Sequence, residues 1–279
     1  MQFKQWTTYL ATGLLATTFA ISSQAEEDWS STEVQFSTGK LLHPHITGTG
    51  GKGSEISTSI ITFQHASSHS YGDNFFFVDH SRVKDNKVDH SRVKDNKTEV
   101  YGEWYSNFSL GAITGNDMSN GLVRDIGLIA GLNFAPGADN IWALPGVRVA
   151  LDLPGFAFAN LDITGYNNIT TASDADKEDS SYMVNLSWAL PFQLGETSWS
   201  LEGHAEYIAA RDVVSSSGDK AEKEAWILAQ PQLRFDMGEA LGGEAGNFFV
   251  GLEYQYWQNK QGNKDVDEST VQLLTVWNF

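Results

Sequence analysis

The stretch VQLLTVWNF occupies residues 271–279 and ends the sequence on an aromatic residue. Trp277 and Phe279 are two residues apart, so an extended chain places both rings on the same face of a strand. Aromatic rings near a strand end are typical of the girdle with which a membrane β-barrel meets the edge of the hydrocarbon layer. The alternative is an ordinary edge strand at the end of a soluble domain. The stretch therefore favours a terminal barrel strand.

The same period of two recurs along the chain. In residues 229–236 the polar side chains Gln230, Gln232 and Arg234 alternate with apolar neighbours, and residues 147–153 and 252–257 repeat the pattern. Apolar and polar faces that alternate in this way indicate strands and not helices. We expect twelve strands, at about residues 31–40, 56–65, 73–82, 98–110, 123–135, 142–153, 157–167, 181–192, 197–211, 225–237, 247–259 and 269–279.

An even number of strands allows both ends of the chain to lie on one side of a membrane. Every strand edge is then paired, which the hydrocarbon layer demands because it offers no hydrogen-bonding partner. The predicted fold is all-β: a twelve-stranded antiparallel transmembrane up-and-down β-barrel. The mean hydropathy of −0.29 and the lack of a long apolar run after the first 25 residues argue against a helical membrane protein.

The first 25 residues have the composition of an export signal. Lys4 supplies positive charge, an apolar run follows from about Leu10 to Ile21, and the segment ends in small residues at Ala25. A membrane anchor is the alternative, but the run is shorter than the roughly 20 residues that a spanning helix needs. We therefore expect a signal peptide over residues 1–25 and one barrel domain over residues 26–279.

The composition excludes several classes of function. The formal net charge is −17, and removal of residues 1–25, which hold one lysine and no acid, makes it −18. Such a charge argues against binding to a nucleic-acid backbone. The chain has no cysteine, and His65 and His69 have helical ligand spacing in a segment that we expect to be a strand end and a turn. We expect no metal and no other cofactor.

The predicted connections alternate between short and long. Residues 153–156 and 194–197 are tight turns, whereas residues 171–180 and 212–224 are long and charged. In bacterial barrels the short turns are periplasmic and the long loops extracellular. Residues 42–54 and 259–268 fall on the outer side by the same count.

A perfect tandem repeat lies in the second outer connection. The ten residues 78–87, VDHSRVKDNK, recur unchanged at residues 88–97. Two copies do not make a solenoid. Because ten is an even number, the insertion preserves the inward or outward direction of the flanking strands. We interpret it as a lengthened hairpin tip, with a variable surface epitope or phage contact as the alternative.

Six segments of the chain resemble the Tsx-like nucleoside channels, in particular their OmpK-type branch. The segments that carry the resemblance are ITFQHA (61–66), YGDNFFFVD (71–79), YGEWY (101–105), LPGF (153–156), AQPQLR (229–234) and GLEYQYW (251–257). It covers essentially the whole chain after residue 25. It implies a twelve-stranded, nucleoside-permeable barrel in the bacterial outer membrane, whose surface loops phages or colicins use as receptors. The tandem repeat departs from the family pattern and puts that receptor role in doubt.

Strand parity predicts which side chains line the lumen. They are polar, aromatic and mostly acidic: Asp73, Phe75, Phe77, Asp79, Glu99, Tyr101, Glu103, Tyr105, Arg148, Asp152, Glu202, His204, Arg234, Asp236, Glu253 and Trp257. The strand at 56–65 has ambiguous parity, so none of its residues is assigned to the lumen.

This lining suits a nucleoside, which joins a flat base to a sugar with several hydroxyls. The candidates to stack the base are Phe75, Phe77, Tyr101, Tyr105 and Trp257. Neighbouring Asp, Glu, Asn and Gln side chains are candidates to bind the ribose hydroxyls. Binding has to stay weak, because a channel conducts only if its solute leaves. The acidic excess predicts that neutral solutes and cations pass better than anions. Alternatively, Arg148 and Arg234 form structural ion pairs with their neighbours.

We do not expect an enzyme. Glu202, His204 and Glu206 share one strand face, but no nucleophile accompanies them. A general cation-leaning porin and a plugged surface receptor or adhesin barrel remain alternatives. The expected partners are nucleosides or similar small solutes, outer-membrane lipid, and the barrel-assembly machinery, which would recognise the terminal strand ending in Phe279.

Overall fold

The computed structural model describes residues 29–44, 53–83, 98–138, 140–171, 176–215 and 217–279. The expected signal peptide, residues 1–25, lies outside these ranges. So does most of the tandem repeat, of which only residues 78–83 are described.

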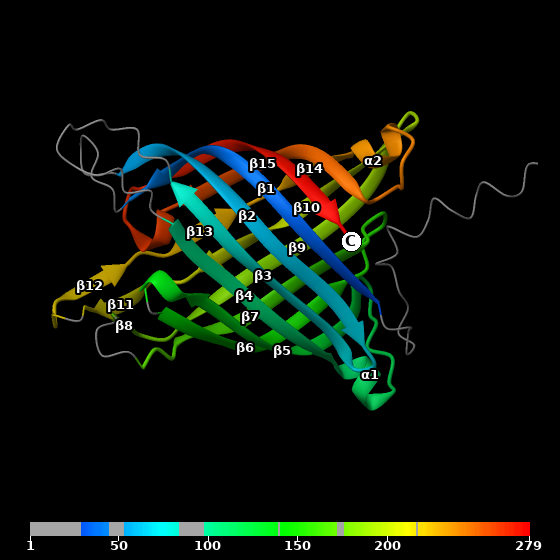
Figure 1. The fold of residues 1–279 in the computed structure, drawn as a ribbon. Coiled ribbons are helices and arrows are strands. Elements are labelled where there is room, and N and C mark those ends of the chain that lie inside the picture. Colours follow the sequence, from blue (N-terminus) through cyan, green and yellow to red (C-terminus); the bar gives the residue numbers. More distant parts are fainter. Residues whose placement is uncertain (1–28, 45–52, 84–97, 139, 172–175, 216) are drawn as a thin grey trace, which may run out of the picture.

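The described residues form a closed antiparallel barrel of twelve strands, shown from the side in Figure 1. The strands are β1 (Ser30–His43), β2 (Ser54–His69), β3 (Gly72–Val83), β4 (Thr98–Ser109), β5 (Val123–Ala135), β6 (Asn140–Leu151), β7 (Phe158–Asn168), β9 (Ser181–Leu194), β10 (Thr197–Ile208), the pair β13 (Trp226–Ala229) and β14 (Gln232–Asp236), which form one interrupted strand, β15 (Phe248–Gln258) and β16 (Glu268–Asn278). The predicted fold class is confirmed.

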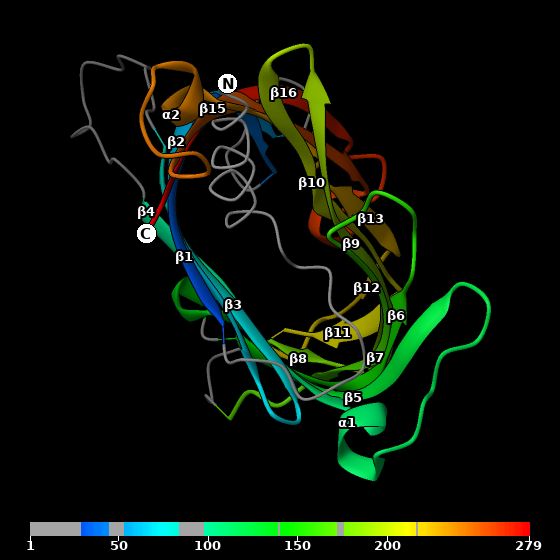
Figure 2. The same cartoon turned by 90° about the vertical axis from the view of Figure 1, so that its right-hand side faces the viewer.

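The last strand closes the barrel on the first. β16 pairs antiparallel with β1, with Glu33 opposite Asn278 and Thr38 opposite Leu273. Beyond the end of β16, the Phe279 backbone N–H donates to the Thr32 carbonyl at 2.9 Å. The ring of strands is visible along its axis in Figure 2. Because no edge strand is left open, the backbone polar groups of the wall are satisfied within the sheet.

The period of two separates an apolar outer face from a polar inner face. In β5, Ile126, Leu128 and Leu132 are exposed, while Gly127, Gly131 and Asn133, which have the opposite parity, are buried. Trp277 and Phe279 are both exposed, and their ring centroids are 6.3 Å apart. An outer band of this kind is what a barrel presents to hydrocarbon, with aromatic rings at its edge.

One predicted strand is interrupted. The run 225–237 was expected to be continuous, but it breaks between β13 and β14 at Gln230 and Pro231. Proline has no N–H to donate to the ladder, so it weakens a strand interior. Gly203 of β10 lies against this break with φ +142°, and a Cβ atom there would be 2.3 Å from the Gln230 carbonyl oxygen.

The two ends of the barrel differ. The turn end, on the right in Figure 1, carries the start of β1, the end of β16, the tight turns and two helices, α1 (Leu110–Thr114) and α2 (Met237–Ala240). The loop end carries a separate three-stranded sheet of β8 (Lys177–Glu178), β11 (Arg211–Val214) and β12 (Lys220–Lys223). It also carries the 3₁₀ turns η1 (Pro136–Ala138) and η2 (Lys260–Gly262). Within the described ranges, no helix is long and apolar enough to cross a membrane.

The tight turns at residues 153–156 and 194–197 are present where the sequence predicted them. The Phe156 N–H donates to the Leu153 carbonyl at 3.1 Å, and Gly155 supplies the left-handed residue with φ +86°. The small sheet was not predicted. The expected strand at 197–211 ends at Ile208, and the chain then leaves the barrel wall to form β11.

Replacement of Gly203 by alanine should destabilise the barrel by about 1–3 kcal/mol, because the new Cβ would meet backbone atoms and the residue would keep a strained φ. Urea unfolding of the refolded barrel in lipid vesicles, followed by tryptophan fluorescence, measures the loss. Gly137→Ala is the matched control, since a Cβ there meets nothing within 4 Å. Equal midpoints for the two variants would show that the close approach at Gly203 carries no constraint.

Candidate functional site

The barrel interior contains a cavity of about 440 Å³ that reaches from the turn end to the middle of the lumen. Side chains mark the extent of the cavity. Ser70 and Ala112 line it at the turn end, and Glu206 and Glu253 line its deepest part. Ligand cavities in proteins have volumes of roughly 300–1,000 Å³. The space is therefore large enough for a small organic solute.

The cavity wall carries a strong excess of acidic groups. Among the described residues, eight carboxylic side chains and three arginines line it: Asp73, Asp79, Glu103, Asp125, Asp162, Glu202, Glu206 and Glu253, with Arg124, Arg148 and Arg234. A lining of one dominant sign raises the local concentration of ions of the opposite sign. The arrangement favours cations and neutral solutes over anions.

Arg148 joins two carboxylates on the β6–β7 side of the lumen. Its Nε and Nη2 atoms donate to the two oxygens of Asp162, each at 2.8 Å, and its Nη1 donates to Asp73 at 2.8 Å. Asp73 also accepts from the Asn107 amide at 2.8 Å. The planar guanidinium fits a carboxylate with two parallel bonds, which fixes its direction.

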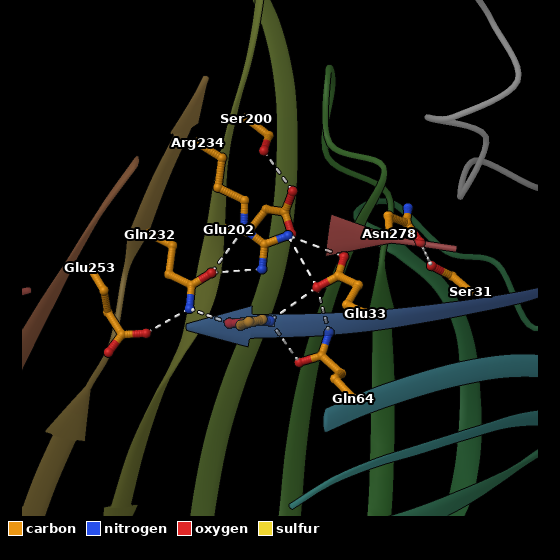
Figure 3. Close-up of polar contacts among 10 residues, drawn as sticks. Ser31, Glu33, Gln64, Ser200, Glu202, Gln232, Arg234, Glu253 and Asn278 are labelled. Atoms are coloured by element: carbon orange, nitrogen blue, oxygen red, sulfur yellow. Dashed lines mark hydrogen bonds and ion pairs between the residues drawn. The ribbon is translucent and has the colours of Figure 1, made fainter. Parts of the chain in front are cut away.

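Arg234 of β14 forms a second cluster with residues of β1 and β10, drawn in Figure 3. Its Nη1 atom lies 3.2 Å from Glu33 and 3.0 Å from Glu202, while Nε and Nη2 donate to the Gln232 side-chain oxygen at 2.9 and 2.6 Å. Gln232 in turn donates to Glu253 at 2.6 Å. The ion pairing expected as the alternative role of the two arginines is thus present.

Glu103 is the hub of a hydrogen-bond network in mid-lumen. The hydroxyls of Tyr101 and Tyr105 donate to it at 2.6 and 2.9 Å, and the Asn133 amide donates to it at 3.1 Å. The ring of Tyr105 lies over Gly131 of the neighbouring strand, where a Cβ atom would come within 2.7 Å of the ring. The glycine makes room for the ring, and the network holds it there.

Two phenylalanines give the cavity an apolar wall. Phe75 and Phe77 lie between Asp73 and Asp79 on the inner face of β3, and their ring centroids are 6.1 Å apart. Tyr101 continues this row, with its ring centroid 6.1 Å from that of Phe77. Carboxyl groups therefore lie beside aromatic rings along one strand, as strand parity predicted.

The structure brings most of the predicted lumen residues together. Eleven of them line the cavity: Asp73, Phe75, Phe77, Asp79, Glu103, Tyr105, Arg148, Glu202, His204, Arg234 and Glu253. The other five lie apart from it: Glu99, Tyr101, Asp152, Asp236 and Trp257.

Each of these five residues lies apart from the cavity for a local reason. Glu99 is exposed near the start of β4. Asp152 is also exposed, because β6 ends at Leu151 and not at residue 153 as predicted. Asp236 accepts from the backbone N–H groups of Glu239 and Gly246, so it caps α2. Tyr101 is engaged by Glu103. The Trp257 ring packs against the buried cluster at the loop end.

Parity reasoning missed several lining residues on β1 and β2. Thr62 and Gln64 line the cavity, as does Gln35. In β2 the alternation of polar and apolar residues was ambiguous, because the apolar residue Ile60 has the inward parity and the polar residue His65 has the outward parity. His65 forms a hydrogen bond with the Thr32 hydroxyl at 2.8 Å. The alternation of β1 was readable in the sequence, since exposed Phe36 lies between buried Gln35 and Ser37.

At the loop end, Glu178 of β8 collects three donors. Its Oε2 atom accepts from Arg211 at 2.5 Å and from the Trp142 indole at 3.2 Å, and its other oxygen pairs with Lys223. Burial raises the pKa of this carboxyl, but the ion pairs with Lys223 and Arg211 outweigh burial and hold the pKa of Glu178 below its ordinary value. The carboxylate stays charged and ties the small sheet to the barrel wall.

Replacement of Arg234 by glutamine should destabilise the barrel by about 3 kcal/mol, because Glu33 and Glu202 would keep their mostly buried charges without a cation. Chemical unfolding of the barrel in vesicles measures the difference. Lys264→Gln is the control: its ion pair with Glu224 spans 3.4 Å and the lysine side chain is 74% exposed, so its loss should cost less than about 1 kcal/mol. Similar losses for both would contradict a structural role for the Arg234 cluster.

The fold, but no sequence family, relates this chain to known proteins. No family model matches the chain, and no curated protein matches it in sequence. A solved outer membrane channel from Pseudomonas putida F1 superposes with a TM-score of 0.50 at 10% identity, over 90% of this chain and 95% of that one. OprB of Pseudomonas putida covers 90% of this chain at 8% identity with a TM-score of 0.28. The first likeness shows that the chain shares the fold of an outer membrane channel barrel.

Proposed function

We propose that this protein is an outer-membrane channel for passive diffusion of nucleosides and similar small solutes. The observation that carries the proposal is the cavity, in which Phe75 and Phe77 lie beside carboxyl groups inside a closed barrel. In this assignment the turn end is periplasmic and the loop end extracellular, as in other barrels with short turns and long loops.

The cavity offers both kinds of contact that a nucleoside needs. The faces of Phe75 and Phe77 suit a flat base, since a stacked base contributes about 1–3 kcal/mol to binding. Asp79 and Gln64, on the same wall, offer groups for ribose hydroxyls. Asp73 and Asp162 are already paired with Arg148, and Glu202 is paired with Arg234. These carboxylates leave the solute to bind weakly, as conduction requires.

The geometry favours a channel over a hydrolase. Glu202, the first acid of the Glu202–His204–Glu206 row, is engaged by Arg234 at 3.0 Å and accepts from Ser200 at 2.6 Å. Ser200 therefore directs its proton to the carboxylate and not to His204. A nucleophile that is activated by this histidine would have to donate to the imidazole instead.

Nucleosides should reduce the single-channel current of the refolded protein in a saturable manner, because a bound nucleoside fills part of the lumen. Planar-bilayer recording with adenosine and thymidine, and with glucose as a matched neutral solute, makes the comparison. Phe75→Ala and Phe77→Ala should weaken the block about 5- to 100-fold, in line with the loss of one stacking contact.

Phe63→Ala is the matched control for these variants, since Phe63 is exposed on the outer face. Equal block by glucose and nucleosides would reduce the claim to a general porin. A barrel that is silent in every recording would favour a plugged receptor or adhesin.

The channel should prefer cations. With a tenfold gradient of KCl across the bilayer, the reversal potential should have the sign of potassium selectivity, because acidic groups dominate the lining. Asp79→Asn combined with Glu253→Gln should move the reversal potential toward zero. Asp117→Asn, in the exposed segment after α1, should leave it unchanged. An anion-selective wild type would contradict the assignment of this lining to the ion path.

A further inference from the structure

The interior of the barrel is filled at the loop end, where the cavity stops. Side chains from the inner faces of β6, β7, β9, β10 and β13 form a buried cluster there: Trp142, Leu144, Tyr166, Met183, Ile208 and Trp226. Leu144 has no exposed surface and Met183 is 1% exposed. These side chains fill the β6–β13 side of the lumen at the loop end, so a solute that crosses the barrel on this side has to pass the cluster.

Two rings of the cluster come from strands that are not neighbours. Tyr166 belongs to β7 and Trp226 to β13, and β9 and β10 lie between these strands in the wall. Their ring centroids are nevertheless 6.4 Å apart, at an interplanar angle of 85°. The ring of Trp142 stacks on Tyr166 with a centroid distance of 5.6 Å. The rings thus reach across a corner of the lumen and form an aromatic box.

The box is occupied by a cation of the protein itself. The guanidinium carbon of Arg211 lies 4.8 Å from the Tyr166 centroid and 4.6 Å from the Trp226 centroid. Arg211 is 5% exposed although it belongs to β11, which lies in the small sheet and not in the barrel wall. Its Nε donates to Glu178 at 2.5 Å. One side chain of a loop segment therefore fills a site that the barrel strands build.

The contacts select a planar, weakly hydrated cation. A guanidinium group stacks on aromatic faces and loses little hydration when it does so, whereas potassium and ammonium ions hold their water more strongly. The Nη1 atom of Arg211 is buried without a hydrogen-bond acceptor among the described residues. The ring faces, together with the single bond to Glu178, are accordingly the main recognition elements.

We infer that Tyr166 and Trp226 form a binding site for planar organic cations, and that Arg211 is its resident occupant, which closes the loop end of the lumen. The inference rests on the proposed channel function. When β11 withdraws, a guanidinium-bearing solute can take the place of Arg211 on its way through the barrel. The same box then serves as a stopper when Arg211 is seated and as a transit site when it is not.

Substitution of Arg211 by alanine tests the stopper. Arg211→Ala should raise the single-channel conductance at least twofold, because the guanidinium leaves the constriction and Glu178 loses one of the links that hold the small sheet. Lys264→Ala, which removes an exposed cation from the adjacent loop, should conduct like wild type. The altered gel migration of folded barrels without heating shows that each variant has closed its wall.

Chemical rescue tests the box. Methylguanidinium at millimolar concentration should return the conductance of Arg211→Ala toward the wild-type level, while equal concentrations of potassium or methylammonium should not. The wild type should respond at least tenfold less, because Arg211 already fills the site. The block should disappear in the double variant Arg211→Ala/Trp226→Leu, which lacks one face of the box.

The outcomes separate this inference from the channel proposal. Wild-type conductance in a folded Arg211→Ala barrel would overturn the stopper and leave the channel standing. A higher conductance that methylguanidinium does not reverse would overturn the box, since the rise would then reflect a general loosening of the loop end. Silence of the wild type and of all variants would overturn the channel function, and the inference with it.

Discussion

The structure depends on the closure of the wall, in which β16 pairs with β1 along six residue pairs from Glu33–Asn278 to Thr38–Leu273. An open edge in hydrocarbon would leave a row of N–H and C=O groups without partners, at several kcal/mol each. Closure removes that cost, but it also creates an interior that no second sheet or helix layer covers. The polar groups inside the barrel must then find their hydrogen-bond and ion-pair partners among side chains of the wall itself or among the loops.

The two halves of the lumen meet this requirement differently. Toward the turn end, carboxyl groups are offset by two arginines, each of which pairs with one carboxylate on a neighbouring strand and one on a more distant strand. This keeps the strongest charges fixed and leaves space between them. Toward the loop end, aromatic and aliphatic side chains fill the space, and the small sheet inserts Arg211 among them. The asymmetry gives the barrel an open half and a closed half.

This division connects the chemistry of the lining with passage through it. In the proposed channel, aromatic rings beside carboxyl groups hold a base and a sugar without a net-charge partner, so contact with the solute stays weak. In the inferred stopper, passage depends on one buried cation, Arg211, whose interactions with the rings are strong because water is excluded from them. Glu178 links that cation to the sheet β8–β11–β12, so closure depends on the position of a segment outside the barrel wall.

Sequence patterns alone predicted the twelve strands of the wall and, outside β2, most of their inner faces, because a period of two is a property of neighbouring residues and needs no tertiary contact. They placed Asp73, Phe75, Glu103 and Arg148 on the inner wall for that reason. Parity failed where one residue of the wrong type interrupted the alternation, as at Ile60 and His65, and it did not foresee the break at Pro231.

Which inward side chains meet depends on the three-dimensional arrangement of the strands. Parity gives a direction but neither a height along the barrel nor a partner across it, and both depend on strand register and tilt. Arg234 therefore pairs with Glu33, which is 201 residues away, and Arg211 leaves a predicted strand to lie between Tyr166 and Trp226. These contacts join distant parts of the chain through the closed wall, so no local pattern could have specified them.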